Sequence, residues 1–258
     1  MEEKYYFPFG QELKKVTQKD RDPKKVFVLG VYSSALHAKW LDVRGRAKVQ
    51  ALAVASEPEI FWRGENAEEE ISKIKIPPEL GRLVPAIKKY NGPSGRALDE
   101  LFLNPIGIDR KNAWLCDLLP ESRANENQYK AISEYYTYDI INKYGLTPAT
   151  IPRFYKSELN SEIRRSEILR ELEQSQASKI ILLGDLPILW FLRFYADQPY
   201  SKLSQFGESQ SSYGQEHEMK INSLNYTVIP LCHPRQADKL GRSNSKWGQL
   251  HDNWIINN

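Results

Sequence analysis

The strongest constraint on the fold is a series of short, mostly apolar runs that are separated by stretches with a helical pattern. Continuous apolar runs of this length are typical of strands that are buried on both faces of a parallel sheet. The runs cover residues 25–30, 49–55, 113–119, 179–184 and 226–231. The first stops at Gly30. The last contains Pro230, so we expect it near a sheet edge or at the end of its strand.

The segments between these runs carry apolar residues at helical spacing. We expect helices over residues 78–90, 94–102, 127–144, 161–174 and 186–195. Strands that alternate with helices predict an α/β protein whose parallel sheet is covered on both faces. The serine-rich segment 201–214 is expected to be a mobile surface loop. No linker or repeat marks a boundary, so residues 1–258 are expected to form a single domain.

Composition excludes several classes of protein. The 36 basic and 33 acidic residues give a net charge of +3, which neither requires nor excludes a nucleic-acid partner. Cys116 and Cys232 lie in apolar runs, where we expect buried thiols rather than a disulfide framework or a metal site. The N-terminal residues do not read as a signal peptide, and no apolar run reaches the length of a membrane span. We therefore expect a cytoplasmic protein.

Ligands of an open parallel sheet bind outside the carboxyl ends of its strands. The residues that follow each run are therefore the candidate site. The first run leads into Gly30, Val31, Tyr32, Ser33 and Ser34. The second leads to Glu57, the third contains Asp117 near its end, the fourth reaches Gly184, and the last leads to His233.

These residues, in this order, resemble the motifs of the uracil-DNA glycosylase superfamily. The matching stretches are Leu29–Ser33, Ala55–Ser56, Leu115–Asp117, Leu182–Gly184 and His233–Arg235. The resemblance implies one three-layer αβα domain around a central, mostly parallel four-stranded sheet. It also implies a monomer that extrudes a pyrimidine base from DNA and hydrolyses its N-glycosidic bond, with no cofactor and no metal.

The sequence departs from the family pattern at four positions. Tyr32 stands where the best-known members carry an acidic residue that activates water, and Arg235 replaces the serine of the His-Pro-Ser loop. Asp117 stands in place of the asparagine that reads uracil. A carboxylate only accepts hydrogen bonds, and cytosine offers its N4 amino group as a donor. Ser34 replaces a bulky tyrosine that blocks substituents at C5. These changes predict a cytosine-type base, with room for a C5 substituent, bound by Asp117 and by Gly30, Val31, Ser33 and Ser34.

His233 is the residue that we single out for catalysis, together with Glu57 and Tyr32. An imidazole at His233 can donate to a base oxygen and stabilise the charge that builds on a departing base. The candidates for the carboxylate that stabilises the sugar cation or activates water are Glu57, Asp42 and Asp117 itself. Glu57 is preferred for its place at the end of the second run, and Asp42 is expected to make a local ion pair. The two histidines at positions 217 and 251 are expected at the surface.

A basic segment follows His233 and is the predicted DNA-binding loop. Its cations and small polar groups suit phosphate contacts, and Leu240 is suited to fill the gap that an extruded base leaves. The predicted contacts are Arg235, Lys239, Leu240, Arg242, Ser243 and Lys246. Binding through this segment should weaken steeply with salt.

Other interpretations of the same residues stay open. A scaffold of this family that has lost its chemistry would bind nucleic acid without releasing a base. A serine hydrolase would use Ser33 or Ser34 with His233, although no Gly-x-Ser-x-Gly elbow is present. Asp117 also suits a cap after a strand, and His233 also suits a structural role. The glycosylase interpretation requires that Tyr32, Asp117 and His233 converge on one cleft.

Overall fold

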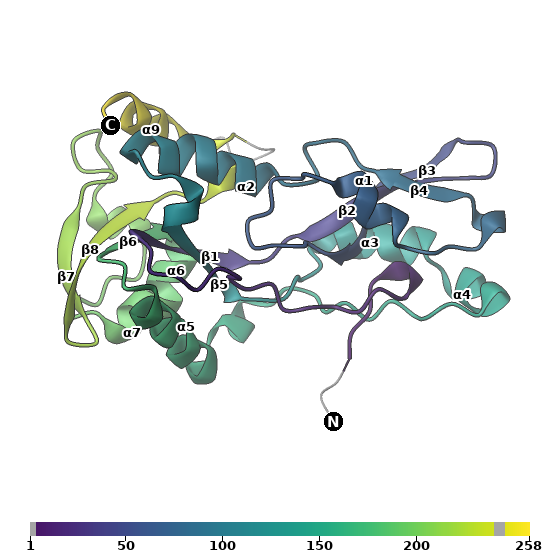
Figure 1. Ribbon diagram of the computed structural model, residues 1–258, viewed down its shortest axis with the longest axis horizontal. Coiled ribbons are helices and arrows are strands. Elements are labelled where there is room, and N and C mark those ends of the chain that lie inside the picture. The colour runs from purple at the N-terminus through teal and green to yellow at the C-terminus, as the bar shows by residue number, and fades with distance from the viewer. Residues whose placement is uncertain (1–3, 240–245) are drawn as a thin grey trace. The chain divides into compact units, whose positions relative to one another are not determined.

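The computed structural model describes residues 4–239 and 246–258 and shows an α/β chain with two compact units (Figure 1). Each unit is assembled from three separate stretches of the chain. The first unit comprises Met1–Val16, Tyr32–Pro93 and Pro120–Lys156. The second comprises Thr17–Val31, Ser94–Leu119 and Ser157–Asn258. The expectation of one domain over residues 1–258 stays a prediction.

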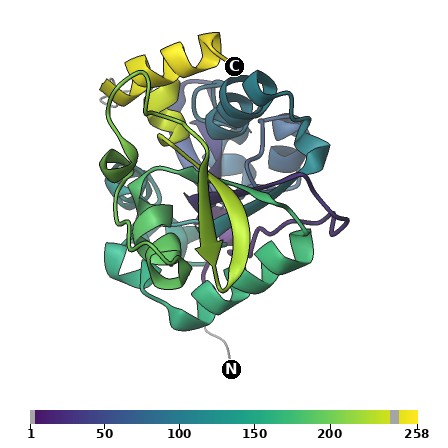
Figure 2. The same ribbon diagram turned by 90° about the vertical axis from the view of Figure 1, so that its left-hand side faces the viewer.

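The second unit is built on a mixed five-stranded sheet that is mostly parallel. Its strands, in spatial order, are β5 (Ala113–Leu119), β1 (Val26–Tyr32), β6 (Lys179–Leu183), β8 (Leu224–Leu231) and β7 (His217–Ile221). β6 pairs in parallel with both β1 and β8, whereas β7 pairs antiparallel with β8. Figure 2 shows β7 and β8 side by side.

The predicted four-stranded sheet is wrong in its strand count, because β7 adds an edge strand. Asn222 and Ser223 both have positive φ, 47° and 71°, and they join Ile221 to its partner Leu224. Two central residues with φ above zero form the tight turn whose twist matches a β-hairpin. This two-residue turn folds β7 back onto β8.

Four of the five predicted strands lie in this sheet. β5 has the predicted bounds, and β6 ends one residue earlier than the run at 179–184. β8 carries Pro230 at its penultimate position, as expected for a strand end. β1 continues through Gly30 to Tyr32, so the prediction that this strand stops at Gly30 is wrong.

Helices flank the sheet of the second unit. Figure 1 shows α2 and α9 on one side of the sheet and α5 and α7 on the other, in keeping with the predicted layers. The helical segments are α2 (Pro93–Ala97), η3 (Leu98–Leu103), η4 (Asn104–Ile106), η5 (Arg110–Asn112), η6 (Lys156–Leu159), α5 (Glu162–Ser175), α6 (Asp185–Pro187), η7 (Ile188–Leu192), α7 (Arg193–Tyr195), η8 (Leu203–Phe206), α8 (Pro234–Ala237) and α9 (Lys246–Ile256).

The predicted helices at 94–102, 161–174 and 186–195 are confirmed. α5 begins where the Ser161 side chain accepts a hydrogen bond from the backbone N–H of Arg164 (3.2 Å), which satisfies one of the free donors of the first turn. The segment 201–214 differs from the expected surface loop, because Leu203, Phe206 and Tyr213 are buried.

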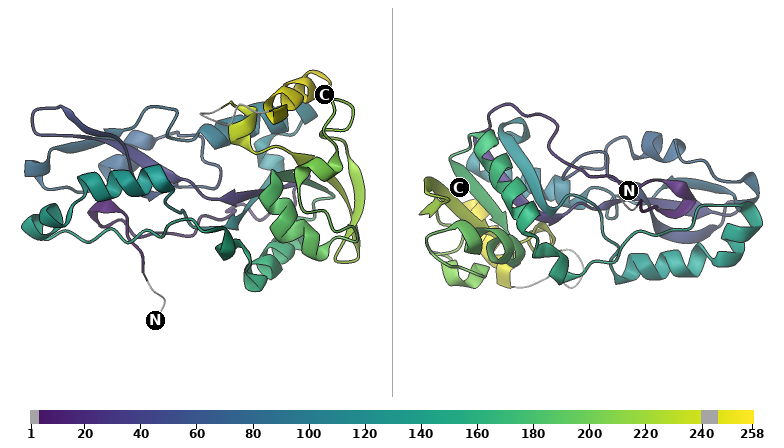
Figure 3. Two further views of the ribbon diagram at one scale, coloured as in Figure 1. Left: turned by 180° about the vertical axis from the view of Figure 1, so that it is seen from behind. Right: turned by 90° about the horizontal axis from the view of Figure 1, so that it is seen from below.

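The first unit contains a three-stranded antiparallel sheet. Its order is β3 (Ala47–Ser56), β2 (Ala35–Leu41) and β4 (Arg82–Pro85). The prediction of a parallel strand at 49–55 is therefore wrong. β2 was not predicted, and β3 folds back against it through the short connection 42–46. The remaining helical segments are η1 (Pro8–Gly10), α1 (Ala67–Ser72), η2 (Pro78–Leu80), α3 (Glu126–Tyr135) and α4 (Tyr138–Tyr144). α3 packs against β3 (Figure 3).

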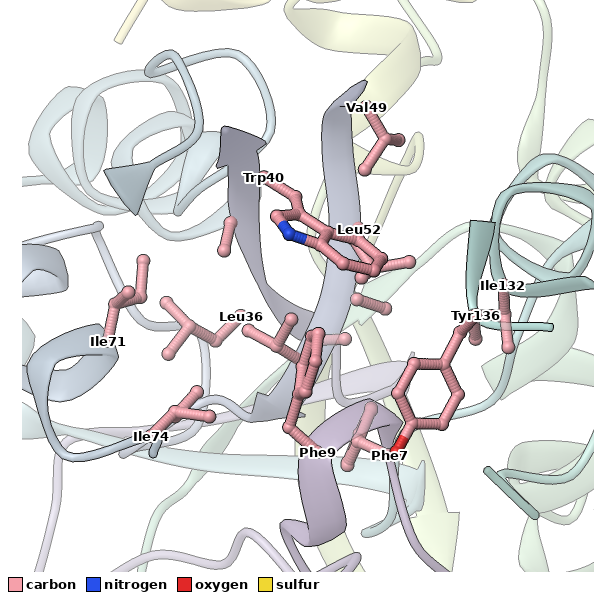
Figure 4. Packing of buried hydrophobic residues seen from close by; sticks show 14 of the residues in the cluster. Phe7, Phe9, Leu36, Trp40, Val49, Leu52, Ile71, Ile74, Ile132 and Tyr136 are labelled. Atoms are coloured by element: carbon pink, nitrogen blue, oxygen red, sulfur yellow. The ribbon is translucent and has the colours of Figure 1, made fainter. Parts of the chain in front are cut away.

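Trp40 of β2 lies in the hydrophobic core of the first unit (Figure 4). Its side chain is fully buried, and its Nε1–H donates to the carbonyl of Leu80 (2.7 Å). The Phe9 ring meets Trp40 edge-on with 5.2 Å between ring centroids, and Tyr136 meets Phe9 at 5.0 Å. Such aromatic pairs contribute about 0.5–1.5 kcal/mol beyond the area that they bury.

Two helix predictions in the first unit are wrong in part or in whole. The segment 78–90 forms η2 and β4, because Gly81 turns the chain with a φ of 91° and a side chain there would overlap the carbonyl oxygen of Leu41. The segment 127–144 forms two helices, because Thr137 is extended and caps α4. α4 ends at Gly145, whose φ of 60° is the usual left-handed stop, as predicted.

Candidate functional site

The carboxyl ends of β1, β6 and β8 form one edge of the sheet in the second unit, since these neighbouring strands are parallel. Gly184 follows β6 directly and has a φ of 90°. Its backbone N–H donates to the carbonyl of Leu231 (2.8 Å), and a Cβ on Gly184 would lie 3.4 Å from the Cβ of His233. The turn after β6 therefore packs against the residue that we singled out for catalysis.

His233 is held by backbone and side-chain hydrogen bonds at the start of α8. Its Nδ1 accepts from the backbone N–H of Arg235, and its own backbone N–H donates to Oε1 of Gln236, both at 3.2 Å. An imidazole whose Nδ1 accepts must carry its proton on Nε2 when it is neutral. Burial, with a smaller contribution from the Arg235 cation, lowers the pKa of His233 to about 4.

His233 is consequently a neutral imidazole with an N–H at Nε2 near pH 7. The residue is partly exposed, and no hydrogen bond from Nε2 to another described residue is present. Such a group donates a hydrogen bond to a ligand oxygen without bringing a full positive charge to the site. Donation from His233 to a base oxygen stays a prediction.

Asp117 lies in β5, which neighbours β1 in the sheet. Its side chain is 4% exposed. Successive side chains of a strand point to opposite faces. Trp114 and Cys116 make contacts with α5, where Trp114 Nε1–H donates to Glu171 Oε2 (3.1 Å), so Asp117 points to the other face of the sheet.

Arg164 of α5 contacts the main chain of Asp117 and was not predicted from the sequence. Its Nη2 donates to the backbone carbonyl of Asp117 (2.7 Å) and lies 3.3 Å from the sulfur of Cys116. Its Nη1 pairs with Glu167 and Glu171, each at 3.1 Å. The guanidinium thus fixes the backbone of β5 at Asp117. The sequence contains the charge but does not indicate that α5 packs on β5.

Both predicted cysteine environments are confirmed, since Cys116 and Cys232 are 1% and 0% exposed. Burial raises the pKa of the Cys232 thiol to about 12 and that of Cys116 well above its usual value, so both stay protonated near pH 7. Neither is a nucleophile at this pH.

Three residues of the predicted loop after β1, namely Tyr32, Ser33 and Ser34, belong to the first unit. Ser33 is buried and Ser34 is exposed in the connection between β1 and β2, and the carbonyl of Ser34 accepts from the Ser122 hydroxyl (2.7 Å). The Tyr32 ring stacks on Phe154, with 4.9 Å between centroids and planes 30° apart. Phe154 was not among the predicted residues, and the only signal for it was an aromatic residue beside Arg153 in a polar segment.

Glu57 does not have the location that the sequence analysis gave it. It follows β3, which is an antiparallel strand of the first unit and not a parallel strand of the five-stranded sheet. It is 6% exposed. Asp42, the less favoured carboxylate, accepts hydrogen bonds from Arg46 and forms an ion pair with it at 3.0 Å, as predicted.

Gly30, Val31, Asp117 and His233 therefore belong to the second unit, whereas Tyr32, Ser33, Ser34 and Glu57 belong to the first. The convergence of Tyr32, Asp117 and His233 on one cleft stays a prediction.

The predicted DNA-binding segment is described only in part. Arg235 is exposed, Lys239 forms an ion pair with Asp252 (2.5 Å), and Lys246 forms one with Glu208 (2.7 Å). These carboxylates neutralise two of the predicted phosphate contacts. Three more of the predicted residues, Leu240, Arg242 and Ser243, lie outside the described residues.

Within residues 4–239 and 246–258, no three His, Cys, Asp or Glu side chains are grouped so that they would hold a metal ion. No helix in this part of the chain has the length and hydropathy that crossing a bilayer requires. No protein-family model matches the sequence, and no curated protein is significantly similar to it.

Proposed function

We propose that the chain is a divergent, uracil-DNA glycosylase-like protein that binds an extruded pyrimidine of DNA and hydrolyses its N-glycosidic bond. The proposal takes it as a cytoplasmic monomer that acts on DNA without a cofactor. The observation that supports it best is the state of His233 at the carboxyl edge of the parallel strands. Its Nδ1 is occupied by a backbone donor, which leaves Nε2–H for a ligand.

The proposed role of His233 follows from this state. As the glycosidic bond breaks, negative charge builds on the base, and a donor aimed at a base oxygen stabilises it. A neutral donor suits this task because it costs little desolvation when the site closes. Removing one such preorganised donor typically raises the barrier by about 2.7–4 kcal/mol.

Asp117 is the proposed base-reading residue. Arg164 holds the main chain of β5 at this position. The Asp117 side chain points to the face of the sheet opposite α5. A carboxylate accepts from the N4 amino group of cytosine, whereas uracil presents O4, another acceptor, at the same position. The small, exposed Ser34 is the proposed neighbour of C5. Gly30, Val31 and Ser33 complete the proposed base-binding loop.

The second candidate function is DNA binding without excision, and Tyr32 favours it. The tyrosine stands where an acidic residue would activate water, and its ring is stacked on Phe154. Excision then depends on another carboxylate, for which Glu57 is our candidate, and Glu57→Gln tests this directly. The hydrolase alternative is disfavoured, since a catalytic triad needs the Nδ1–H of its histidine to donate to a carboxylate. At His233 that nitrogen accepts from a backbone N–H.

The test is to incubate the protein with duplex and single-stranded DNA containing cytosine, 5-substituted cytosines or uracil, and to measure free bases by mass spectrometry. Binding is measured in parallel by fluorescence anisotropy. We expect release of a cytosine-type base by the wild type, at least a hundredfold less release by His233→Ala, and full release by the control His217→Ala on β7.

Each outcome has a defined meaning. Binding without release supports the second candidate. Preference for uracil overturns the assignment of Asp117, and equal release by His233→Ala overturns that of His233. The absence of both DNA binding and base release contradicts the proposal as a whole.

A further inference from the structure

A continuous chain of buried hydrogen bonds connects α9 to the residue before His233. The His251 ring lies between two partners, with Nε2 2.9 Å from the carbonyl oxygen of Leu101 and Nδ1 2.8 Å from Oη of Tyr213. The backbone N–H of Cys232 donates to the same Tyr213 oxygen at 2.9 Å. Tyr213, Cys232 and His251 are 2%, 0% and 0% exposed.

The chemistry of the groups permits one pattern of protons along this chain. The Leu101 carbonyl only accepts, so His251 Nε2 carries a proton. Burial lowers the pKa of His251 to about 4, so the ring is neutral near pH 7 and Nδ1 accepts from the Tyr213 hydroxyl. The Tyr213 oxygen then has a lone pair for the Cys232 N–H. Every donor in the chain is used.

The far end of the chain is the peptide group that leads into the candidate site. β8 ends at Leu231, so the N–H of Cys232 lies beyond the sheet, and Tyr213 is its partner. The next residue is His233. A hydrogen bond to a fully buried N–H restrains the direction of that peptide, because leaving the N–H unpaired would cost about 1–3 kcal/mol.

The loop that carries Tyr213 is itself locked to α9. Trp254 Nε1–H donates to the carbonyl of Gly214 (3.1 Å), and a Cβ on Gly214 would come within 2.5 Å of the Trp254 ring. His251 packs between Phe102 and Trp254, with ring centroids at 4.3 and 5.1 Å. Tyr213 therefore has little freedom to follow a displaced Cys232. The peptide before His233 is therefore restrained by its hydrogen bond to Tyr213 and by the packing of the Tyr213 loop on α9.

We propose that Tyr213 and His251 are positioning residues for His233, acting through the hydrogen bond from Tyr213 to the Cys232 peptide. The inference rests on the proposed function of His233. Neither residue touches the proposed base. Their role is to hold the main chain so that Nε2 of His233 keeps its direction while the base departs, which is the preorganisation that makes a single donor effective.

The test uses Tyr213→Phe, which removes the hydroxyl and keeps the ring. The matched control is Tyr226→Phe in β8, whose ring is also buried and whose hydroxyl is outside this chain of hydrogen bonds. The first measurement is amide hydrogen exchange at Cys232, relative to the amide of Leu182 in β6. The second is the ¹⁵N chemical shifts of the His233 ring.

We expect exchange at Cys232 to accelerate about tenfold relative to Leu182 in Tyr213→Phe and to stay unchanged in the control. The His233 ring shifts should change in the same variant only. His251→Gln, which keeps one donor and one acceptor, should restrain Cys232 better than His251→Leu. Where base release is measurable, Tyr213→Phe should lower kcat and leave KM unchanged.

Unchanged exchange and unchanged His233 shifts in Tyr213→Phe and His251→Leu would overturn the inference. These two measurements do not depend on base release. If they change as expected but the wild type releases no base, the positioning of His233 stands and the proposed excision fails.

Discussion

Lowering the pH from 7 to 5 should destabilise each unit through a buried histidine. His37 in the first unit is 8% exposed, and His251 in the second is 0% exposed. Burial lowers the pKa of both from 6.5 to about 4. As the pH falls through 6.5, the unfolded chain binds a proton at each histidine and the folded chain does not. The contribution of these histidines to the free energy of unfolding is therefore most favourable above this pH. It declines as the pH falls, until the folded histidines also bind protons near pH 4.

The magnitude follows from the same two pKa values. The separation between 6.5 and about 4 corresponds to about 3 kcal/mol for each histidine, of which linkage assigns about 2 kcal/mol to the interval between pH 7 and pH 5. Carboxylates with ordinary pKa values titrate mainly below this interval. His233 adds to the effect in the second unit, since its pKa is also about 4. A loss of several kcal/mol is a large part of the stability of most proteins.

The assay is urea unfolding at pH 7, 6 and 5, followed by tryptophan fluorescence and far-UV circular dichroism. His37→Gln and His251→Gln each remove one titrating group. Each variant should lose about 2 kcal/mol less than the wild type between pH 7 and pH 5. His217→Gln should reduce the loss as well, because burial also lowers the pKa of this partly buried histidine. Wild-type stability that does not change over this interval, or variants that lose as much as the wild type, would refute the reasoning.

Three further substitutions test separate features. Gly184→Ala should lower the free energy of unfolding by about 1 kcal/mol or more, since its φ of 90° is strained for any residue with a Cβ, and an unchanged urea midpoint would contradict this. Glu208→Gln should free Lys246 from its ion pair, so that it can contact a phosphate. Anisotropy titrations at several salt concentrations should then show tighter DNA binding and a slope of log K against log salt concentration that is steeper by about 0.9. An unaltered slope would exclude this lysine as a contact. Trp40→Phe should cost about 1–3 kcal/mol in urea unfolding, because the carbonyl of Leu80 loses its donor, whereas a loss below about 0.5 kcal/mol would mean that this hydrogen bond contributes little.

Features that depend on neighbouring residues could be predicted from the sequence. The strand at Ala113–Leu119 is an apolar run that is stopped by a proline, and the helix at Glu162–Ser175 begins at a serine cap. The helix predicted over residues 78–90 was wrong, although the apolar spacing of this segment fits a helix. Gly81, with its positive φ and its close approach to β2, makes that helix impossible.

Features that depend on which segments meet could not be predicted. The run at 49–55 has the composition of a parallel strand, but it pairs antiparallel with β2 in a separate sheet. His233 was singled out because it directly follows an apolar run and precedes a proline, and its role stays a prediction. Tyr213 and His251 were expected at the surface, and the structure buries both.

The spatial order β5-β1-β6-β8-β7 has a consequence for synthesis on the ribosome. β1 leaves the exit tunnel well before its neighbour β6, which begins only at Lys179. At typical translation rates the roughly 150 intervening residues take about 8–30 s to make. During that time the backbone edge of β1 that pairs with β6 has no partner strand. The same strand carries Val26–Leu29, whose apolar side chains are fully buried in the finished protein. The nascent chain is thus most prone to aggregation, and most in need of a chaperone, between the emergence of β1 and the emergence of β6.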